Sequence, residues 1–259
     1  MIKQIFTNSE FEFDRLTPNC YTRKLKSNFN AYETTYDFCR FYKAETDSAK
    51  AIICMFNSSM LVATVANTDY NEDFISDLIT FIHMNMPSMV EVDKLIAEKL
   101  QNSLSSYYDF NIRTEYVYDK KVEPFNIFVD ENPKLDEIFN IVKVAFPALA
   151  DTYEMWITDT SHRLRRNQAW LYCYKKSSTL MVKYILDGYA LIGQVGTLPE
   201  ARGNNYAREL LYYTINKMQS QGIKVCLFAR EKMFSYYEEL GFTPVLMDLV
   251  LERKTINDK

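Results

Sequence analysis

The amino-acid sequence predicts an α/β protein made of two domains. Strand-like and helix-like apolar patterns alternate along the chain. Its 259 residues exceed what one hydrophobic core usually serves, so we expect domains at 1–120 and 121–259. The six glycines all lie at position 188 or later. This distribution excludes a glycine-based phosphate-binding turn from the first domain.

The first domain is predicted to follow the order strand, strand, helix, strand, helix, strand. Asn57-Ser58-Ser59 forms a short polar turn between two apolar runs, which is typical of a hairpin. Asn71 and Asp93 are well placed to cap the two helices. The predicted elements are strands 51–56 and 60–66, helix 71–83, strand 89–92, helix 93–104 and strand 112–118.

The second domain is predicted to begin with a strand and two helices, followed by a hairpin. Its later strand at 189–197 contains Gly193 and Gly196, which in a strand indicate a bulge or the close approach of another group. A cofactor arm lying against the strand suits that pattern. The predicted elements are strand 125–129, helices 133–146 and 148–165, strands 169–174, 180–186 and 189–197, helix 208–221, strand 225–229 and helix 235–240.

The turn between the glycine-bearing strand and the next helix is the candidate phosphate site. The first N–H groups of a helix have no intrahelical partner, and the helix dipole adds partial positive charge there, so a pyrophosphate is favoured. Arg202 adds a full positive charge beside this turn. An apolar stripe anchors the helix and so fixes its first turn. The stripe consists of Ala207, Leu210, Leu211, Thr214 and Met218, with Gly222 as the stop.

Two segments of the second domain resemble the GNAT superfamily of acyl-CoA-dependent N-acyltransferases. The family's phosphate signature is Gln or Arg, two residues, Gly, one residue, then Gly or Ala. In this sequence it falls on residues 202–207, with Asn205 in place of the central glycine. The second segment is Ser235-Tyr236-Tyr237-Glu238-Glu239-Leu240-Gly241-Phe242, a short helix that Gly241 stops. The resemblance covers about residues 121–252.

The resemblance implies a GNAT fold, in which a mixed, mostly antiparallel central sheet is flanked by helices. The similar order of elements in residues 1–120 favours a degenerate GNAT-like copy without a phosphate loop, and therefore two tandem domains. Asn tolerates a left-handed backbone better than other residues with a side chain, so the turn can keep a positive φ at Asn205 at a cost of about 1 kcal/mol. If the family glycine instead permits close approach of the ligand, Asn205 weakens binding.

The resemblance also implies the chemistry, which is direct attack of an amine on an acyl thioester. Backbone groups of Val195 and Thr197 would align the pantetheine arm, and an N–H near Val195 would polarise the thioester carbonyl. Tyr237 would protonate the departing thiolate. Between a phenol with a pKa near 10 and a thiol with a pKa near 8.5, that transfer is uphill by about 2 kcal/mol. Packing beside Met233 and Leu240 is the alternative explanation for Tyr237, and Tyr236 is predicted to fill the core.

The predicted cofactor-binding residues come from the strand, the turn and the end of the following strand. Arg230 stands where many members of the family have an Asn that bonds the cofactor, and a surface cation is the alternative reading. The general base is left open among Glu154, Asp159, Asp187 and a chain of water molecules. The predicted set is Val195, Gly196, Thr197, Arg202, Gly203, Asn204, Asn205, Tyr206, Ala207 and Arg230, with Tyr237 as the catalytic residue.

Composition limits the partners and the location. The net charge of −4 gives no basic field for nucleic acid, and no apolar stretch is long enough to span a membrane. Without an N-terminal apolar run, a cytoplasmic location is expected. The five cysteines are odd in number and widely spaced, which predicts reduced core thiols. With two histidines and no Cys or His cluster, no metal site is predicted.

The predicted function is therefore a cytoplasmic N-acetyltransferase that uses acetyl-CoA as acyl donor and a small primary amine as acceptor. The identity of the amine, the acyl chain preference and the oligomeric state are left open by the sequence. The alternative from another class is an acyl-CoA-binding protein without turnover, in which Asn205 has weakened the site.

Overall fold

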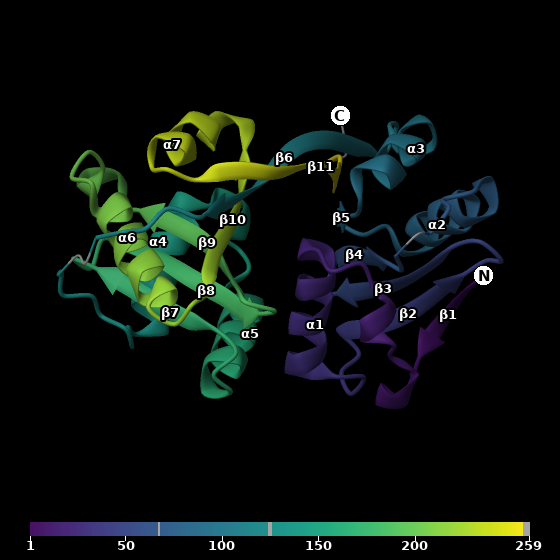
Figure 1. Ribbon diagram of the computed structural model, residues 1–259, viewed down its shortest axis with the longest axis horizontal. Helices are drawn as coiled ribbons and strands as arrows, with labels where there is room; N and C mark the ends of the chain where they lie inside the picture. The colour runs from purple at the N-terminus through teal and green to yellow at the C-terminus, as the bar shows by residue number, and fades with distance from the viewer. Residues whose placement is uncertain (67, 124–125, 256–259) are drawn as a thin grey trace. The chain divides into compact units, whose positions relative to one another are not determined.

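The computed structural model describes residues 1–66, 68–123 and 126–255. Two compact units make up the chain (Figure 1). The first contains residues 1–113 together with the C-terminal segment that starts at Met247, and the second contains residues 114–246. Each unit is an α/β structure with a mixed sheet flanked by helices, as the sequence predicts. Within the described ranges, every helix is too short or too polar to cross a membrane.

The first unit has the strand order β1-β2-β3-β4-β5-β11-β6. Neighbours from β1 to β4 pair in antiparallel fashion, β5 runs parallel to β4, and β11 pairs antiparallel to β5. Short 3-10 helices at Asn8–Glu10 and Phe13–Arg15 precede α1. The elements are β1 (Ile2–Ile5), α1 (Cys20–Tyr32), β2 (Cys39–Glu45), β3 (Lys50–Phe56), β4 (Ser59–Thr64), α2 (Glu72–Asn85), β5 (Met89–Glu91), α3 (Lys94–Leu104), β6 (Tyr108–Tyr118) and β11 (Thr243–Arg253).

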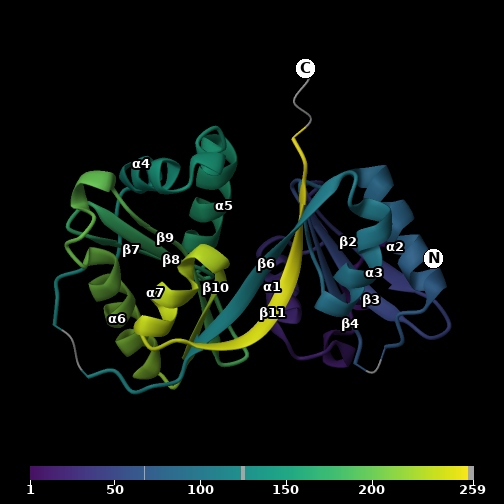
Figure 2. The same ribbon diagram turned by 90° about the horizontal axis from the view of Figure 1, so that it is seen from above.

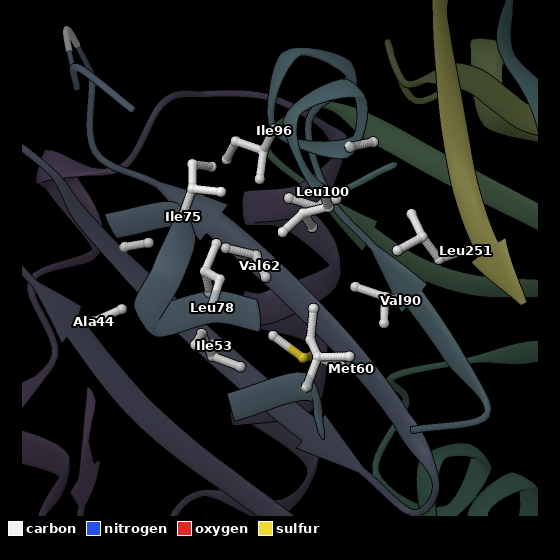
Figure 3. Close-up of a cluster of buried hydrophobic side chains, with 14 of the residues drawn as sticks. Ala44, Ile53, Met60, Val62, Ile75, Leu78, Val90, Ile96, Leu100 and Leu251 are labelled. Carbon is white, nitrogen blue, oxygen red and sulfur yellow. The ribbon is translucent and has the colours of Figure 1, made fainter. Parts of the chain in front are cut away.

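Alternation along the strands divides the first unit into layers. Ile53 on β3 points to the core beneath α2 and α3, whereas its neighbour Cys54 accepts a hydrogen bond from Asn28 of α1 (3.5 Å). Figure 3 shows Leu78 of α2 and Leu100 of α3 in the cluster that includes Ile53. Predicted caps are confirmed, because the side chain of Asn71 accepts from the Phe74 N–H and that of Asp93 accepts from the Leu95 N–H.

A buried ion-pair network ties the C-terminal strand into the first unit. The fully buried Asp248 of β11 pairs with Arg113 of β6 (Nε to Oδ1, 3.1 Å) and accepts a hydrogen bond from the Tyr21 hydroxyl (3.0 Å). Arg113 also pairs with Glu91 of β5, which Lys24 of α1 bonds as well.

The same network controls the charge of Glu91. Burial raises the pKa of the Glu91 carboxyl, but the positive charges of Lys24 and Arg113 outweigh burial and hold the pKa below its ordinary value. Ionised Glu91 therefore stabilises the fold above its ordinary pKa. That contribution is lost as the pH falls toward the lowered value.

The second unit has the strand order β6-β10-β9-β8-β7. β7, β8 and β9 pair in antiparallel fashion, and β10 runs parallel to β9. Short 3-10 helices occur at Pro147–Leu149, Pro199–Ala201 and Glu231–Met233. The elements besides β6 and β11 are α4 (Leu135–Ala145), α5 (Tyr153–Arg165), β7 (Trp170–Tyr174), β8 (Ser178–Leu186), β9 (Tyr189–Thr197), α6 (Tyr206–Gln219), β10 (Lys224–Arg230) and α7 (Phe234–Glu239).

Helices cover both faces of the second sheet. Figure 2 shows α4 and α5 on one face of β7 to β10 and α6 and α7 on the other. The first core joins Ile138 and Trp156 to Leu171 of β7, and the second joins Leu210 and Leu211 to Val225 of β10. The sheet is therefore buried from both sides.

The boundary between the two units differs from the one that the sequence predicts. The predicted boundary at 120/121 is replaced by one inside β6, and the C-terminal strand from Met247 belongs to the first unit. The long strands β6 and β11 run through both units: β6 contributes Tyr108 to the first core and Tyr116 to the second, whereas Leu251 of β11 is buried in the first. Sequence patterns do not reveal such sharing, because it depends on pairing between distant residues.

The predicted strand 125–129 is wrong for residues 126–129, which form no strand, while residue 125 lies outside the described residues. Apolar alternation exists there, since Val129 is buried and Phe128 exposed. However, only Asp130 bridges to β7, through Cys173. Residues 1–50 also contain β1, α1 and β2, for which no element was predicted.

Strand β9 is the element that shapes the site. Its parallel pairing with β10 runs from Lys224 opposite Tyr189 to Leu227 opposite Ile192 and ends there, although both strands continue. Against β8, three steps of β9 from Gly193 to Gly196 oppose two steps of β8, which defines a bulge. Gln194 lies in this bulge with φ of 53°.

An added side chain at either glycine of β9 would meet another part of the protein. A Cβ on Gly196 would lie 2.7 Å from the Ala145 Cβ of α4, a contact that neither group can relieve by rotation. A Cβ on Gly193 would lie 2.7 Å from the Lys183 Cε, the flexible part of a side chain. Gly196 is thus required for α4 to pack against β9.

Asp248→Asn is expected to lower the free energy of unfolding by about 3 kcal/mol, because Arg113 would lose one of its charged partners while it stays buried. Urea unfolding of the full chain measures this change. Asp119→Asn, at an exposed position after β6, is the matched control and should change the value by less than about 0.5 kcal/mol. Equal effects of the two substitutions would show that the buried pair contributes nothing specific.

Gly196→Ala is expected to destabilise the chain by about 1–3 kcal/mol, because the new methyl group overlaps Ala145 and pushes α4 away from β9. Gly193→Ala is the control within the same strand and should cost less, since the Lys183 side chain can move aside. Thermal unfolding of both variants tests the difference. The explanation fails if Gly193→Ala is the more damaging of the two.

Candidate functional site

A pocket of about 840 Å³ lies in the second unit where β9 and β10 have parted. It is lined by the ends of both strands, the turn before α6, the end of α4 and residues of α7. Because the strands no longer pair beyond Ile192 and Leu227, β9 can offer backbone N–H and C=O groups to a ligand there. The parted strands therefore form a cleft with polar walls.

The turn before α6 presents a run of unused backbone donors. Among the described residues, the N–H groups of residues 203–208 donate to no acceptor, and the first bonded N–H is that of Glu209, which donates to the Asn205 carbonyl (2.9 Å). Gly203 and Asn205 have φ of 82° and 60°. Successive N–H groups in such a turn at a helix N-terminus form a concave site for an anion.

Asn205 is the residue that replaces the family glycine, and it adopts the left-handed conformation expected of it (φ 60°, ψ 11°). Its side chain makes no capping hydrogen bond to α6 and is exposed. The turn geometry is thus kept without glycine. Because Asn205 also lines the pocket, its side chain is near enough to contact a ligand.

The electrostatic character of the pocket is positive. Arg202, Arg208, Arg230 and Lys232 line it, and no Asp or Glu belongs to the lining within the described chain. The Nε of Arg208 is buried and has no hydrogen-bond partner among the described residues. Such a buried donor beside unused N–H groups suits a multiply charged phosphate ligand.

Arg208 is a lining residue that the phosphate signature does not include. It lies one residue beyond the phosphate signature, and its position on the first turn of α6, immediately after Ala207, was the available signal.

Tyr237 of α7 also belongs to the lining of the pocket. The side chain is 7% exposed, and its hydroxyl makes no hydrogen bond to the part of the chain that is described. Burial raises the pKa of Tyr237 to about 12. Full proton transfer from this phenol to a thiolate with a pKa near 8.5 is uphill by about 5 kcal/mol, compared with the 2 kcal/mol expected for an unperturbed phenol. The hydroxyl is therefore better suited to donate a strong hydrogen bond to the thiolate sulfur, while negative charge develops there, than to transfer its proton early.

Tyr236 packs against the core of the second unit, as the sequence predicts, and it also contributes to the pocket. It is half-buried and lines the pocket, with its ring 5.2 Å from that of Tyr237 in an edge-on arrangement. Burial raises the pKa of Tyr236, and the charge of Arg208 opposes that rise. Both tyrosines of the predicted pair thus face the cleft.

The α4 and α5 side of the pocket adds residues that no motif indicates. Ala145 and Phe146 line it from the end of α4. Gln194 lines it from the β9 bulge, and its Oε1 accepts a hydrogen bond from the Trp156 Nε1 of α5 (3.2 Å). No pattern in the sequence links Trp156 to Gln194, because the contact joins residues 38 positions apart.

None of the three candidate bases belongs to the pocket lining. Asp159 pairs with Arg163 on its own helix (2.6 Å), and Asp187 lies in the turn before β9, at the end of the strand away from the pocket. Glu154 is exposed in the first turn of α5. Of the predicted candidates for removing the proton of the amine, a chain of water molecules is the one that remains.

The structure gathers most of the predicted site residues in this one pocket. Asn204 is outside the lining, and its side-chain amide donates to the Ala201 carbonyl (3.1 Å), so it holds the turn together. The predicted residues in the lining are Val195, Gly196, Thr197, Arg202, Gly203, Asn205, Tyr206, Ala207, Arg230 and Tyr237.

Comparison with solved structures finds the same fold in several proteins. A putative acetyltransferase from Pyrococcus horikoshii has a TM-score of 0.65 at 15% identity and covers 100% of this chain and 91% of its own. A tandem GNAT protein from the clavulanic acid biosynthesis pathway has a TM-score of 0.63 at 10% identity, over 100% and 99% of the two chains. A GCN5-related N-acetyltransferase from Sphaerobacter thermophilus has a TM-score of 0.60 at 17% identity, over 90% and 85%. These likenesses concern the fold, and they include a tandem arrangement over the whole chain.

Comparison with curated protein sequences finds no match. Among protein-family models, that of the acetyltransferase (GNAT) family matches residues 135–242, which span α4 to the end of α7 and include the pocket. The matched segment contains the phosphate turn, the parted strand β9 and Tyr237. We conclude that residues 135–242 of this chain are a domain of the acetyltransferase (GNAT) family.

Proposed function

We propose that this protein is an N-acetyltransferase that transfers an acetyl group from acetyl-CoA to the primary amine of a small molecule by direct attack. The observation that supports this proposal most is the run of unused N–H groups at residues 203–208, because all of these residues except Asn204 line the same pocket as Tyr237. A pyrophosphate needs such donors, and the family membership of residues 135–242 supplies the reaction class.

Acetyl-CoA supplies an electrophilic thioester carbonyl and a thiolate leaving group. The residues that would hold it are the turn at 202–208 for the pyrophosphate, with Arg202 and Arg208 as charged partners, and the unpaired end of β9 for the pantetheine arm. A backbone N–H near Val195 would donate to the carbonyl oxygen as it gains negative charge. This donor needs no reorganisation, because the strand already holds it.

Tyr237 would act at the sulfur. As the amine nitrogen bonds to the carbonyl carbon and the C–S bond breaks, the phenol donates its hydrogen bond, and finally its proton, to the thiolate. The proton that the amine loses passes to water and returns to the phenolate, so that the products are the amide and the free thiol. A cytoplasmic location is part of the proposal, supported by five buried cysteines that form no disulfide and lie among the described residues.

Calorimetry and a thiol-release assay with a panel of primary amines test the proposal on the full chain. We expect one CoA site per chain and release of free CoA with at least one amine. Two sites or no binding would contradict the assignment of the phosphate turn. Binding without release for every amine would favour an acyl-CoA-binding protein without turnover, for which the Asn205 replacement is the motivating observation.

Arg202→Ala is expected to weaken CoA binding about 10- to 100-fold, because it removes a charged partner of the pyrophosphate. Pantetheine, which has no phosphate, serves as the control ligand, and its affinity should change less than about twofold. Calorimetric titration of both ligands measures the contrast. Equal losses for the two ligands would indicate a folding defect and not a phosphate contact.

Tyr237→Phe is expected to lower the turnover number about 10²- to 10⁴-fold with little change in acetyl-CoA affinity, because only the donor hydroxyl is removed. The matched control is Tyr116→Phe. Tyr116 packs against Tyr237 but bonds Glu238 (2.8 Å) and is not in the pocket lining, so its loss should leave turnover nearly unchanged. Full turnover in Tyr237→Phe would make Tyr237 a packing residue.

The pH dependence follows from the pKa of Tyr237. Since burial raises that pKa to about 12, the phenol keeps its proton at every pH from 6 to 10. The ratio of wild-type to Tyr237→Phe turnover should therefore stay constant over this range, as measured with a saturating amine. A ratio that falls with an inflection inside the range would mean that the phenol ionises there and that burial does not control it.

A further inference from the structure

The hydrogen bond between Trp156 and Gln194 fixes which atom of the amide is left for another partner. An indole N–H can only donate, so the amide atom 3.2 Å from the Trp156 Nε1 must be the oxygen, Oε1. The amide NH2 of Gln194 then points away from Trp156. Within the described part of the chain it has no acceptor, so two N–H donors remain available at a residue of the lining.

The placement of Gln194 is held from several sides. Its backbone has a φ of 53°, a conformation that is unfavourable for a residue with a side chain and persists where surrounding packing imposes it. Trp156 is itself 7% exposed and packs against the Phe139 ring at 5.3 Å. A donor that is held this firmly can distinguish ligands by a single hydrogen bond.

The surroundings of Gln194 indicate which ligand it meets. The cations of the lining come from the turn before α6, from its first turn, and from the region where β10 ends. Gln194 belongs to the other wall, where Ala145 and Phe146 supply apolar surface from α4. An amine that lies there would meet an apolar wall with one amide donor. An anionic substituent on this amine would meet no carboxylate among the described residues of the lining.

We propose that Gln194 is a specificity-determining residue that binds an oxygen of the acceptor, and that the acceptor carries a carboxylate or carboxamide besides its amine. Trp156 is the positioning residue that turns the Gln194 amide toward this oxygen. The assignment rests on the proposed function, because it describes the acceptor of the same reaction.

The test measures binding of matched acceptors to the CoA-loaded full chain by calorimetry. Each set contains an α-amino acid, its carboxamide, and the amine in which hydrogen replaces the carboxyl group. Wild type should bind the two oxygen-bearing members at least about tenfold more tightly in one or more sets, as expected for a hydrogen bond to a fixed donor. The carboxamide separates hydrogen bonding from charge, because it is neutral.

Gln194→Glu is the matched variant, because a carboxylate keeps the shape and the acceptor for the Trp156 N–H but has no donor for the ligand. The preference for both oxygen-bearing members should disappear, while the affinity for CoA alone stays within about twofold. Trp156→Phe keeps the ring against Phe139 and frees the amide to rotate, so it should reduce the same preference. If either variant does not fold, the other still decides.

Two results would overturn the assignment: a wild-type chain that binds all three members of every set equally, or variants that weaken all members to the same degree. Thiol release is recorded separately with the same acceptors. A Gln194-dependent preference without thiol release would refute the proposed reaction and leave the recognition in place. Release that favours the amines without oxygen would refute the recognition and leave the reaction in place.

Discussion

The candidate site depends on one structural constraint, the end of pairing between β9 and β10 after Ile192 and Leu227. Two parallel strands that remained paired would bond each other's backbone and leave no space for a ligand. The bulge at Gln194 and the packing of α4 on Gly196 shape β9 where it leaves β10. The pocket is therefore a consequence of strand geometry. Its side chains line a cleft that the backbone has already opened.

Anchoring of α6 suits this cleft to the phosphate ligand that we propose. Leu210, Leu211 and Thr214 are fully buried, which fixes the helix against the sheet and holds its N-terminus in place. The unused N–H groups then face the pocket without any capping side chain that would have to leave. Arg208 adds a positive charge, and its buried Nε is shielded from water, which strengthens its interaction with an anion. In the proposed complex, rigid backbone donors and a partly buried cation would bind one ligand together.

The first unit has a different role in the architecture. Its residues 1–113 contain no glycine. Its strands β5, β6 and β11 are joined by a buried network in which Arg113 pairs with Glu91 and with Asp248. This network includes the C-terminal strand, which comes after the acetyltransferase-family segment in the chain. The first unit is thus completed only when the end of the chain is present, and the two units share the strands β6 and β11.

The sequence by itself determined the local features of this protein. The caps Asn71 and Asp93, the phosphate turn with a left-handed Asn205, the helix α6 and the short helix with Tyr237 all follow from interactions within a few residues, which the order of amino acids encodes directly. Only the tertiary structure decided the pairing of Val250 with Glu91, the absence of a strand at 126–129, and the meeting of Trp156 with Gln194. Those outcomes depend on which distant surfaces pack together, and a one-dimensional pattern of apolar residues carries no information about that choice.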